Sequence, residues 1–128
     1  HLTTIALEKE PETFEKSDSK FHPVKSLIDV GAKVTIASDY ATSDPDVLGN
    51  IFGAIARDNG EGASLKEMIK AATINSAHAN FLENEVGSLA LGKKADIIVL
   101  SKNLFEIPKR DIPSVNIEMT FFEGKQVH

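Results

Sequence analysis

The chain has 128 residues, 41% of them hydrophobic, which suits one domain with a buried core and is well below the roughly 250 residues of a complete eight-stranded α/β barrel. Its formal net charge is −5, and its 19 acidic and 14 basic residues form no long run, which argues against a nucleic-acid or membrane-surface partner. Because the sequence has no cysteine, disulfides and thiolate metal sites are excluded, and any metal must be bound by His, Asp or Glu.

The first part of the chain has the rhythm of a parallel α/β unit. Residues 2–7 form a short β-permissive run. Pro23 can open a helix, because its missing N–H would have no partner in the first turn, and Gly31 suits the left-handed position that follows a helix end. The apolar segment 33–38 is then predicted to be a buried strand, and Asp39 follows it directly.

Three further helices are predicted after this strand. Asp44 and Pro45 are interpreted as the N-cap and the first turn of a helix with an apolar stripe. Ser64 and Glu67 have the spacing of a capping box at the start of the next helix. Asn75 is expected to be the N-cap of a short last helix.

After residue 82 the pattern changes to short strands. The predicted strands cover residues 87–89, 95–100 and 115–122, with a turn at Glu123-Gly124 into a terminal strand. In the third of these strands apolar and polar residues alternate, as in a sheet with one face exposed to water. The sequence therefore predicts an α/β fold in two regions, residues 1–82 and residues 83–128.

Asp39 is the strongest single candidate for an active-site residue. In parallel α/β architectures, reactive groups lie at the carboxyl ends of strands, where the loops meet. A carboxylate at this place can bind a divalent cation and accept a proton from metal-bound water. The alternative is an aspartate that only starts a turn or caps the next helix, and position alone favours this alternative.

Several segments carry a resemblance to a known enzyme family. Residues 31–40, Gly-Ala-Lys-Val-Thr-Ile-Ala-Ser-Asp-Tyr, resemble the last barrel strand of the amidohydrolase superfamily and its terminal aspartate. Residues 72–77 resemble the Thr-x-Asn-x-Ala helix boundary of that family. Residues 85–100 are similar to the Gly-Ser-Leu…Gly-Lys-x-Ala-Asp segment by which these enzymes return to a small β-sandwich. The tail segments 103–108 and 120–125 resemble the YtcJ-like, amidohydrolase-3 branch.

The resemblance implies a fold and an activity. Residues 1–82 would be the terminal segment of a (β/α)8 barrel, about its last two strands with their helices, and residues 83–128 would add strands to a small composite β-sandwich. The whole enzyme would use one or two divalent metal ions, zinc foremost, to hydrolyse a C–N bond in a small-molecule amide or cyclic amide. Asp39 would be a metal ligand and the catalytic proton shuttle.

The other metal ligands that the resemblance implies have no counterpart in this sequence. They would be a His-x-His pair, a Lys or Glu, and further His residues on earlier strands, and no His-x-His occurs here. A catalytic zinc ion normally has three protein ligands, so the 128-residue chain alone is expected to be inactive. Tyr40 stands where relatives often carry Trp. This difference would alter the substrate pocket but would not remove the Asp39 carboxylate.

Four other polar residues are expected to have structural roles. His22 is interpreted as a surface residue at a helix start, and His78 as a packed or solvated residue of a helix. Arg57 is expected late in its helix, where its charge suits the helix dipole; contact with a substrate anion is the less favoured alternative. Asp96 is expected to make turn hydrogen bonds before a strand.

Two further expectations concern context and the alternative function. No apolar stretch approaches the roughly 20 residues that span a bilayer, and the N-terminus shows no signal peptide, so a cytoplasmic setting is the default. The chain lacks an initiator Met and is interpreted as part of a longer protein. The alternative function is a non-catalytic regulatory or interaction domain with the amidohydrolase shape. A partial barrel would also expose strand edges and apolar helix faces, which favour a homo-oligomer.

Overall fold

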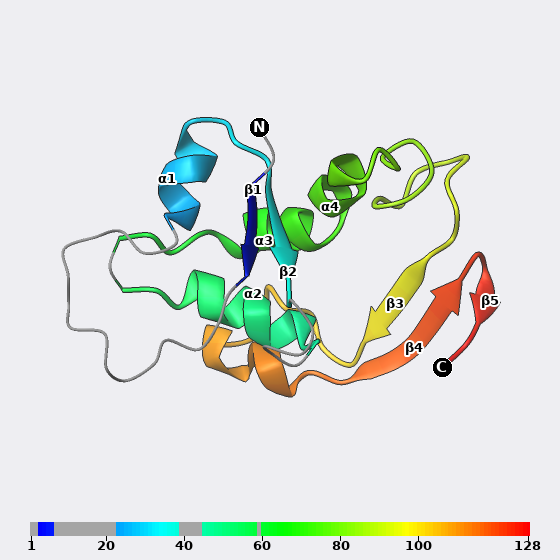
Figure 1. Cartoon of the computed structure of the whole chain (residues 1–128). Coiled ribbons are helices and arrows are strands. Elements are labelled where there is room, and N and C mark those ends of the chain that lie inside the picture. Colours follow the sequence, from blue (N-terminus) through cyan, green and yellow to red (C-terminus); the bar gives the residue numbers. More distant parts are fainter. Residues whose placement is uncertain (1–2, 7–22, 39–44, 59) are drawn as a thin grey trace.

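The computed structural model describes residues 3–6, 23–38, 45–58 and 60–128 (Figure 1). The predicted α/β class is confirmed: helices dominate the first part, and short strands follow it. In chain order the elements are β1 (Thr3–Ala6), α1 (Val24–Asp29), β2 (Val34–Ala37), α2 (Val47–Ile55), α3 (Leu65–Ala72), α4 (Ile74–Ala79), β3 (Ile97–Leu100), the 3-10 helix η1 (Lys109–Ser114), β4 (Ile117–Phe122) and β5 (Lys125–Gln126).

The strands β1 and β2 form a parallel pair, in which Thr3 lies opposite Val34. Parallel neighbours need a crossover connection, and α1 lies within it. The helix ends at Asp29 with Val30 as its C-cap, and Gly31 takes the left-handed position that follows, as predicted, with a φ of 83°. The N–H of Ala32 donates to the carbonyl of Leu27 (3.0 Å), closing a Schellman motif around that glycine. The predicted parallel α/β unit is therefore confirmed.

The caps of α2 and α3 show why these helices begin where they do. The carboxylate of Asp46 accepts a hydrogen bond from the N–H of Gly49 (2.9 Å), which makes Asp46 the N-cap of α2. The sequence pattern instead assigned this role to Asp44, which lies outside the described residues. The capping box is confirmed: the hydroxyl of Ser64 accepts from the N–H of Glu67 (3.2 Å), and the Glu67 carboxylate accepts from the N–H of Ser64 (3.0 Å).

The helix α4 begins differently from the prediction. Its N-cap is Thr73, so the assignment of Asn75 as the cap is wrong. Asn75 lies in the first turn, and its side-chain amide donates to the carbonyl of Val34 in β2 (3.0 Å). This hydrogen bond between segments far apart in the sequence replaces the local cap and ties α4 to the strand.

One hydrophobic core joins the two parts of the chain. Figure 1 shows η1, in orange, packed beside α2. Leu104, Ile112 and Val115 come from the second predicted region, yet they pack with buried residues of α1, β2, α2 and α3. The division at residue 82 stays a prediction, and the shared core shows that the later segment also stabilises the first. The core residues are Val24, Val34, Ile51, Ala54, Ile55, Ala63, Met68, Ala71, Leu104, Ile112 and Val115.

The strands β3, β4 and β5 form an antiparallel sheet in that order. The turn between β4 and β5 lies at Glu123 (φ 48°) and Gly124 (φ 80°), as predicted. The strand predicted for residues 87–89 is wrong, because Gly87 has a φ of 84°, far from extended backbone, and residues 87–89 form no strand. None of the helices in the described ranges is long and apolar enough to cross a membrane.

The small sheet lacks the single wet face that the alternating pattern predicts. Ile117 and Met119, expected on the buried face of β4, are 42% and 39% exposed. Ile98 and Phe122 lie on the opposite face by the register of the strands, and they are 52% and 60% exposed. Both faces therefore present apolar side chains, because no described element covers either of them completely.

Candidate functional site

The carboxyl end of β2 is the place where the sequence predicts the active site. Val34 and Thr35 are buried in this strand, and Ser38 follows it as a half-buried residue. Asp39, the predicted catalytic residue and metal ligand, lies outside the described residues, and so do Tyr40 and His22. What the structure describes is the strand that leads to Asp39 and the surroundings of its end.

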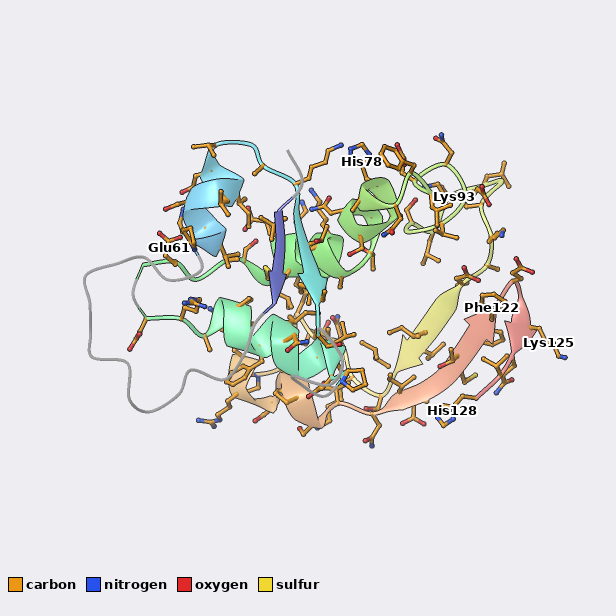
Figure 2. The ribbon with its side chains drawn as sticks, in the orientation of Figure 1. Glu61, His78, Lys93, Phe122, Lys125 and His128 are labelled. Atoms are coloured by element: carbon orange, nitrogen blue, oxygen red, sulfur yellow. The ribbon has the colours of Figure 1, made fainter. Side chains whose placement is uncertain are left out.

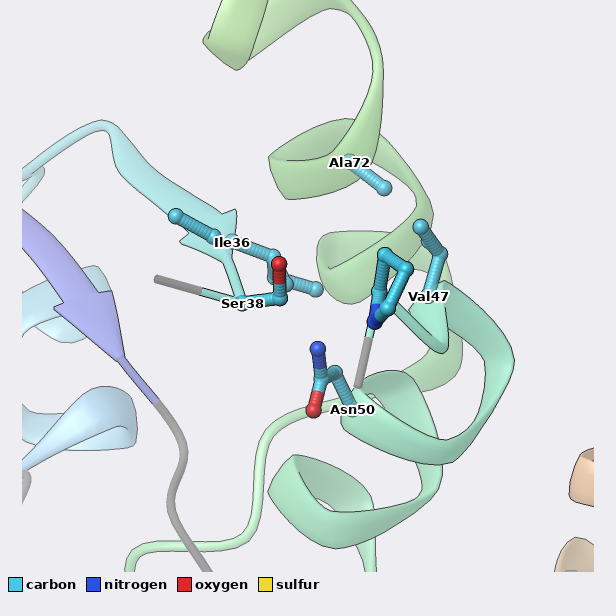
Figure 3. Close-up of a pocket in the computed structure, with 7 residues that line it drawn as sticks. Ile36, Ser38, Val47, Asn50 and Ala72 are labelled. Atoms are coloured by element: carbon cyan, nitrogen blue, oxygen red, sulfur yellow. The ribbon is translucent and has the colours of Figure 1, made fainter. Parts of the chain in front are cut away.

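A pocket of about 350 Å³ opens at this end of β2 (Figure 3). Its volume lies in the range of small-molecule sites. The walls come from the end of β2, the start of α2 and the last residue of α3, and two of the lining residues, Ser38 and Asn50, have polar side chains. The lining residues are Ile36, Ala37, Ser38, Pro45, Val47, Asn50 and Ala72.

Asn50 is absent from the candidates that the sequence suggests. It lies one helical turn after Val47, so both side chains face the pocket, whereas Ile51, Ala54 and Ile55 face the core. In Figure 3 the amide end of Asn50 is directed toward the end of β2, where Ser38 lies. A polar residue at helical spacing within an apolar stripe is the signal in the sequence that could have drawn attention to it.

The described residues do not form a metal centre by themselves. Among them, no group of three or more His, Asp or Glu side chains lies close enough to hold a metal ion. A catalytic zinc ion normally needs three protein ligands. We therefore assign no chemical step to a metal within the described part of the chain.

His78 is paired with a carboxylate at the end of α4. Its Nδ1 lies 3.1 Å from Oε1 of Glu83. The backbone N–H of Glu83 itself, followed by His78, lowers the pKa of this carboxyl group below its ordinary value. A half-buried histidine with this partner agrees with the packed or solvated role expected from the sequence.

Arg57 lies beyond the end of α2, so its predicted position in the last helical turn is wrong. The helix ends at Ile55. In a longer helix, the carbonyl of Ala54 would accept from the N–H of residue 58, but it accepts from the N–H of Ala63 instead (3.2 Å). The chain thus turns away before Arg57 can join the helix.

Lys93 holds the loop between α4 and β3 in place (Figure 2). Its ammonium group donates to the backbone carbonyls of Glu83 and Val86, the second at 3.2 Å. Across the loop, the N–H of Lys94 donates to the carbonyl of Glu85 (2.8 Å). Lys93, the first lysine of the Gly-Lys-Lys-Ala-Asp segment, therefore has a structural role, because it bonds to two backbone carbonyls of the loop.

Asp96 connects this segment to the turn between β4 and β5. Its Oδ1 accepts from the N–H of Glu123 (2.8 Å). The ammonium group of Lys94 lies 3.0 Å from the carboxylate of the same Glu123. The sequence predicted hydrogen bonds in a local turn, whereas the Asp96 carboxylate bonds to the turn between β4 and β5, 27 residues further along the chain.

Comparison with known proteins finds a matching family and several related proteins. A family model described as "Amidohydrolase family" matches residues 10–128. Imidazolonepropionase of Bdellovibrio bacteriovorus is 36% identical over 111 residues, which cover 85% of this chain and 26% of that protein. N-substituted formamide deformylase of Arthrobacter pascens is 29% identical over 113 residues, which cover 82% of this chain and 21% of that protein.

Solved structures show the same fold. An amidohydrolase from Thermotoga maritima has a TM-score of 0.68 and 23% identity, covering 82% of this chain and 25% of that one. An adenosine deaminase from Xanthomonas campestris, described with bound zinc, has a TM-score of 0.67 and 18% identity, covering 81% of this chain and 27% of that one. The chain thus spans about a quarter of the length of the relatives that it matches.

Proposed function

The chain belongs to the amidohydrolase family, and we propose that it is the C-terminal part of a metal-dependent hydrolase that cleaves C–N bonds in small molecules. The observation that carries this proposal is the family match over residues 10–128. The names of the relatives, an imidazolonepropionase and a formamide deformylase, support a cyclic amide or an amide as the bond that is cleaved.

In this proposal β1 and β2 are the last two strands of a (β/α)8 barrel, with residues 1–82 as barrel segment. Their parallel register and the helices α1 to α4 support this assignment. Residues 83–128 contribute β3, β4 and β5 to a small composite β-sandwich. The exposed apolar side chains on both faces of this sheet support a place within a larger layered structure.

Asp39 is the residue to which we assign the chemistry. When bound, a divalent ion, zinc foremost, would lower the pKa of a water molecule. At the carboxyl end of β2, Asp39 would be one ligand of this ion and would take the proton of the attacking water. It would then pass this proton to the leaving nitrogen as the C–N bond breaks. The remaining ligands would come from parts of the enzyme outside this chain.

The substitution Asp39→Asn in the complete enzyme tests this role. Asparagine keeps the size of the side chain but cannot take a proton, so we expect turnover to fall by about 10²- to 10⁴-fold. Asp58→Asn, at an exposed position after α2, is the matched control and should leave turnover unchanged. Wild-type turnover in Asp39→Asn would refute the assignment.

The 128-residue chain alone is expected to be inactive and to bind zinc only weakly. One carboxylate cannot replace the three protein ligands of a catalytic zinc site. Calorimetric titration of this chain with zinc should show no tight binding. Stoichiometric binding with a dissociation constant below about 1 μM, the affinity scale of a specific site, would contradict this expectation.

A second candidate function is a non-catalytic regulatory or interaction domain that retains the amidohydrolase shape. The exposed apolar residues Ile98 and Phe122 on the small sheet favour it, because contiguous apolar surface is typical of protein interfaces. The metal content of the complete protein separates the two candidates. Zinc at one or two ions per chain supports the enzyme, and its absence together with lack of hydrolysis supports the regulatory domain.

A further inference from the structure

We propose that the pocket at the carboxyl end of β2 is an amide-recognition subsite, in which Asn50 pairs with the amide group of a small cyclic amide. This inference rests on the proposed function, since it names the residue that would orient a substrate of that class. It depends on described residues only: the position of Asn50, the state of its side-chain amide, and the lining of the pocket.

The backbone of Asn50 is held firmly. Its N–H donates to the carbonyl of Asp46 (3.0 Å), and the Asp46 carboxylate caps the same turn through Gly49. The next residue, Ile51, is 3% exposed and anchors the helix in the core. The carboxamide therefore projects into the pocket from a fixed base, which lowers the entropy lost when a ligand binds.

The side-chain amide of Asn50 has no hydrogen-bond partner within the part of the chain that the structure describes. Three other asparagines of the chain use their side-chain amides in hydrogen bonds. Asn75 donates to the carbonyl of Val34 (3.0 Å), Asn80 to the carbonyl of Ser76 (2.8 Å), and Asn103 to the carboxylate of Glu106 (2.9 Å). Asn50 thus offers an unused acceptor and two unused donor hydrogens to the pocket.

The chemistry of a carboxamide selects the class of ligand. Its oxygen accepts and its nitrogen donates side by side, which matches the N–H and C=O of a cis amide, the geometry that a lactam or imide ring enforces. Two parallel hydrogen bonds can then form. The apolar walls from Ile36, Val47 and Ala72 suit the CH₂ groups of such a ring. A ketone of the same ring size would lose the N–H and one of the two hydrogen bonds.

Binding of 2-pyrrolidinone and cyclopentanone tests the inference. Both probes are five-membered rings with one carbonyl, and only the first has an N–H. Ligand-observed NMR titration of the complete protein should show about 2- to 10-fold tighter binding of 2-pyrrolidinone, the effect of one neutral hydrogen bond. Asn50→Leu should abolish this preference. Asn84→Leu, the same change at an exposed position, should preserve it.

Circular dichroism of each variant guards against a misfolded protein. If Asn50→Leu fails to fold, Asn50→Ala replaces it, since alanine favours a helix. The inference is overturned if the wild type binds both probes equally, or if the preference survives in a folded Asn50 variant. The binding assay needs no turnover, so its outcome is independent of the test of the proposed function. Wild-type turnover in Asp39→Asn would reject the catalytic role of Asp39, but the binding preference would still be judged from the NMR titration alone.

Discussion

Glu61 caps the first turn of α1 from a loop 35 residues away. Its carboxylate accepts the backbone N–H of Ser26 (2.8 Å) and the hydroxyl of the same residue (2.6 Å). The backbone N–H of the third residue of any α-helix has no hydrogen-bond partner inside the helix. Pro23, at the N-cap position of α1, makes no side-chain hydrogen bond that would cap the helix. Glu61 is only 2% exposed, and Figure 2 shows it beside α1. The loop between α2 and α3 therefore fixes the helix that connects β1 with β2.

Glu61→Ala should lower the free energy of unfolding by about 2 kcal/mol. The substitution leaves the N–H and the hydroxyl of Ser26 without this acceptor in a site that water barely reaches, and such a loss costs about 1–3 kcal/mol. Urea denaturation followed by circular dichroism measures the effect. Glu118→Ala, at an exposed position of β4, should change stability by less than about 0.5 kcal/mol. Equal effects of the two substitutions would show that the Glu61 contact contributes nothing.

Gly87→Ala should destabilise the chain more than the same change at Gly92. Both glycines have a positive φ, 84° and 89°, which costs an alanine about 1 kcal/mol. A Cβ at Gly87 would lie 2.6 Å from Cβ of Ala77 and 3.0 Å from Cα of Ile74, whereas a Cβ at Gly92 would have nothing within 4 Å. Overpacking adds about 1–3 kcal/mol. Thermal unfolding of both variants gives the difference, and equal Tm values would exclude close packing of the loop against α4.

The elements that the sequence predicted well are those fixed by local chemistry. The capping box of Ser64 and Glu67, the left-handed Gly31 and the turn at Glu123-Gly124 depend on residues within a few positions of each other. The predicted cap at Asn75 is wrong because its amide bonds to Val34, 41 residues earlier. The strand expected at Gly87 is wrong because that glycine packs against α4. Neither contact can be predicted from the residues that lie next to Asn75 or Gly87 in the sequence.

Of the two candidate site residues, one was predicted from the sequence and the other is found only from the structure. A carboxylate after a buried strand, together with the family segments, was enough to predict Asp39 as the catalytic residue and metal ligand, and this stays a prediction because Asp39 lies outside the described residues. Asn50 became a candidate only because the structure places it in the lining of the pocket. Its place depends on how α2 and the end of α3 meet the end of β2, and spacing within one helix does not determine this packing.

The capping box of α3 should make stability depend on pH. The hydrogen bonds from the hydroxyl and then the backbone N–H of Ser64 lower the pKa of Glu67 in the folded chain below its ordinary value of 4.5. A lowered pKa stabilises the fold above pH 4.5, and this contribution is lost as the pH falls through the folded pKa. The Tm difference between wild type and Glu67→Gln should therefore be largest near neutral pH and shrink below pH 4.5. A difference that stays constant down to pH 3 would show that the carboxylate charge has no part in the cap.

The exposed apolar residues of the small sheet should drive self-association of the 128-residue chain. Ile98 and Phe122 share one face of the sheet and are 52% and 60% exposed, and apolar patches of this kind mark contact surfaces. Sedimentation velocity over a concentration series should show a rising mean mass for the wild type. The double variant Ile98→Lys with Phe122→Lys should stay monomeric, because two charges on this face oppose burial.

A charge added elsewhere controls for the general effect of charge on solubility. Val30→Lys lies at the end of α1, where the valine is 80% exposed and isolated from the sheet, so this variant should associate like the wild type. If it stays monomeric as well, net charge rather than the sheet governs association. If the wild type is monomeric at every concentration, the apolar face alone is too weak to hold two copies together, and the oligomer expected from the sequence is rejected for this chain.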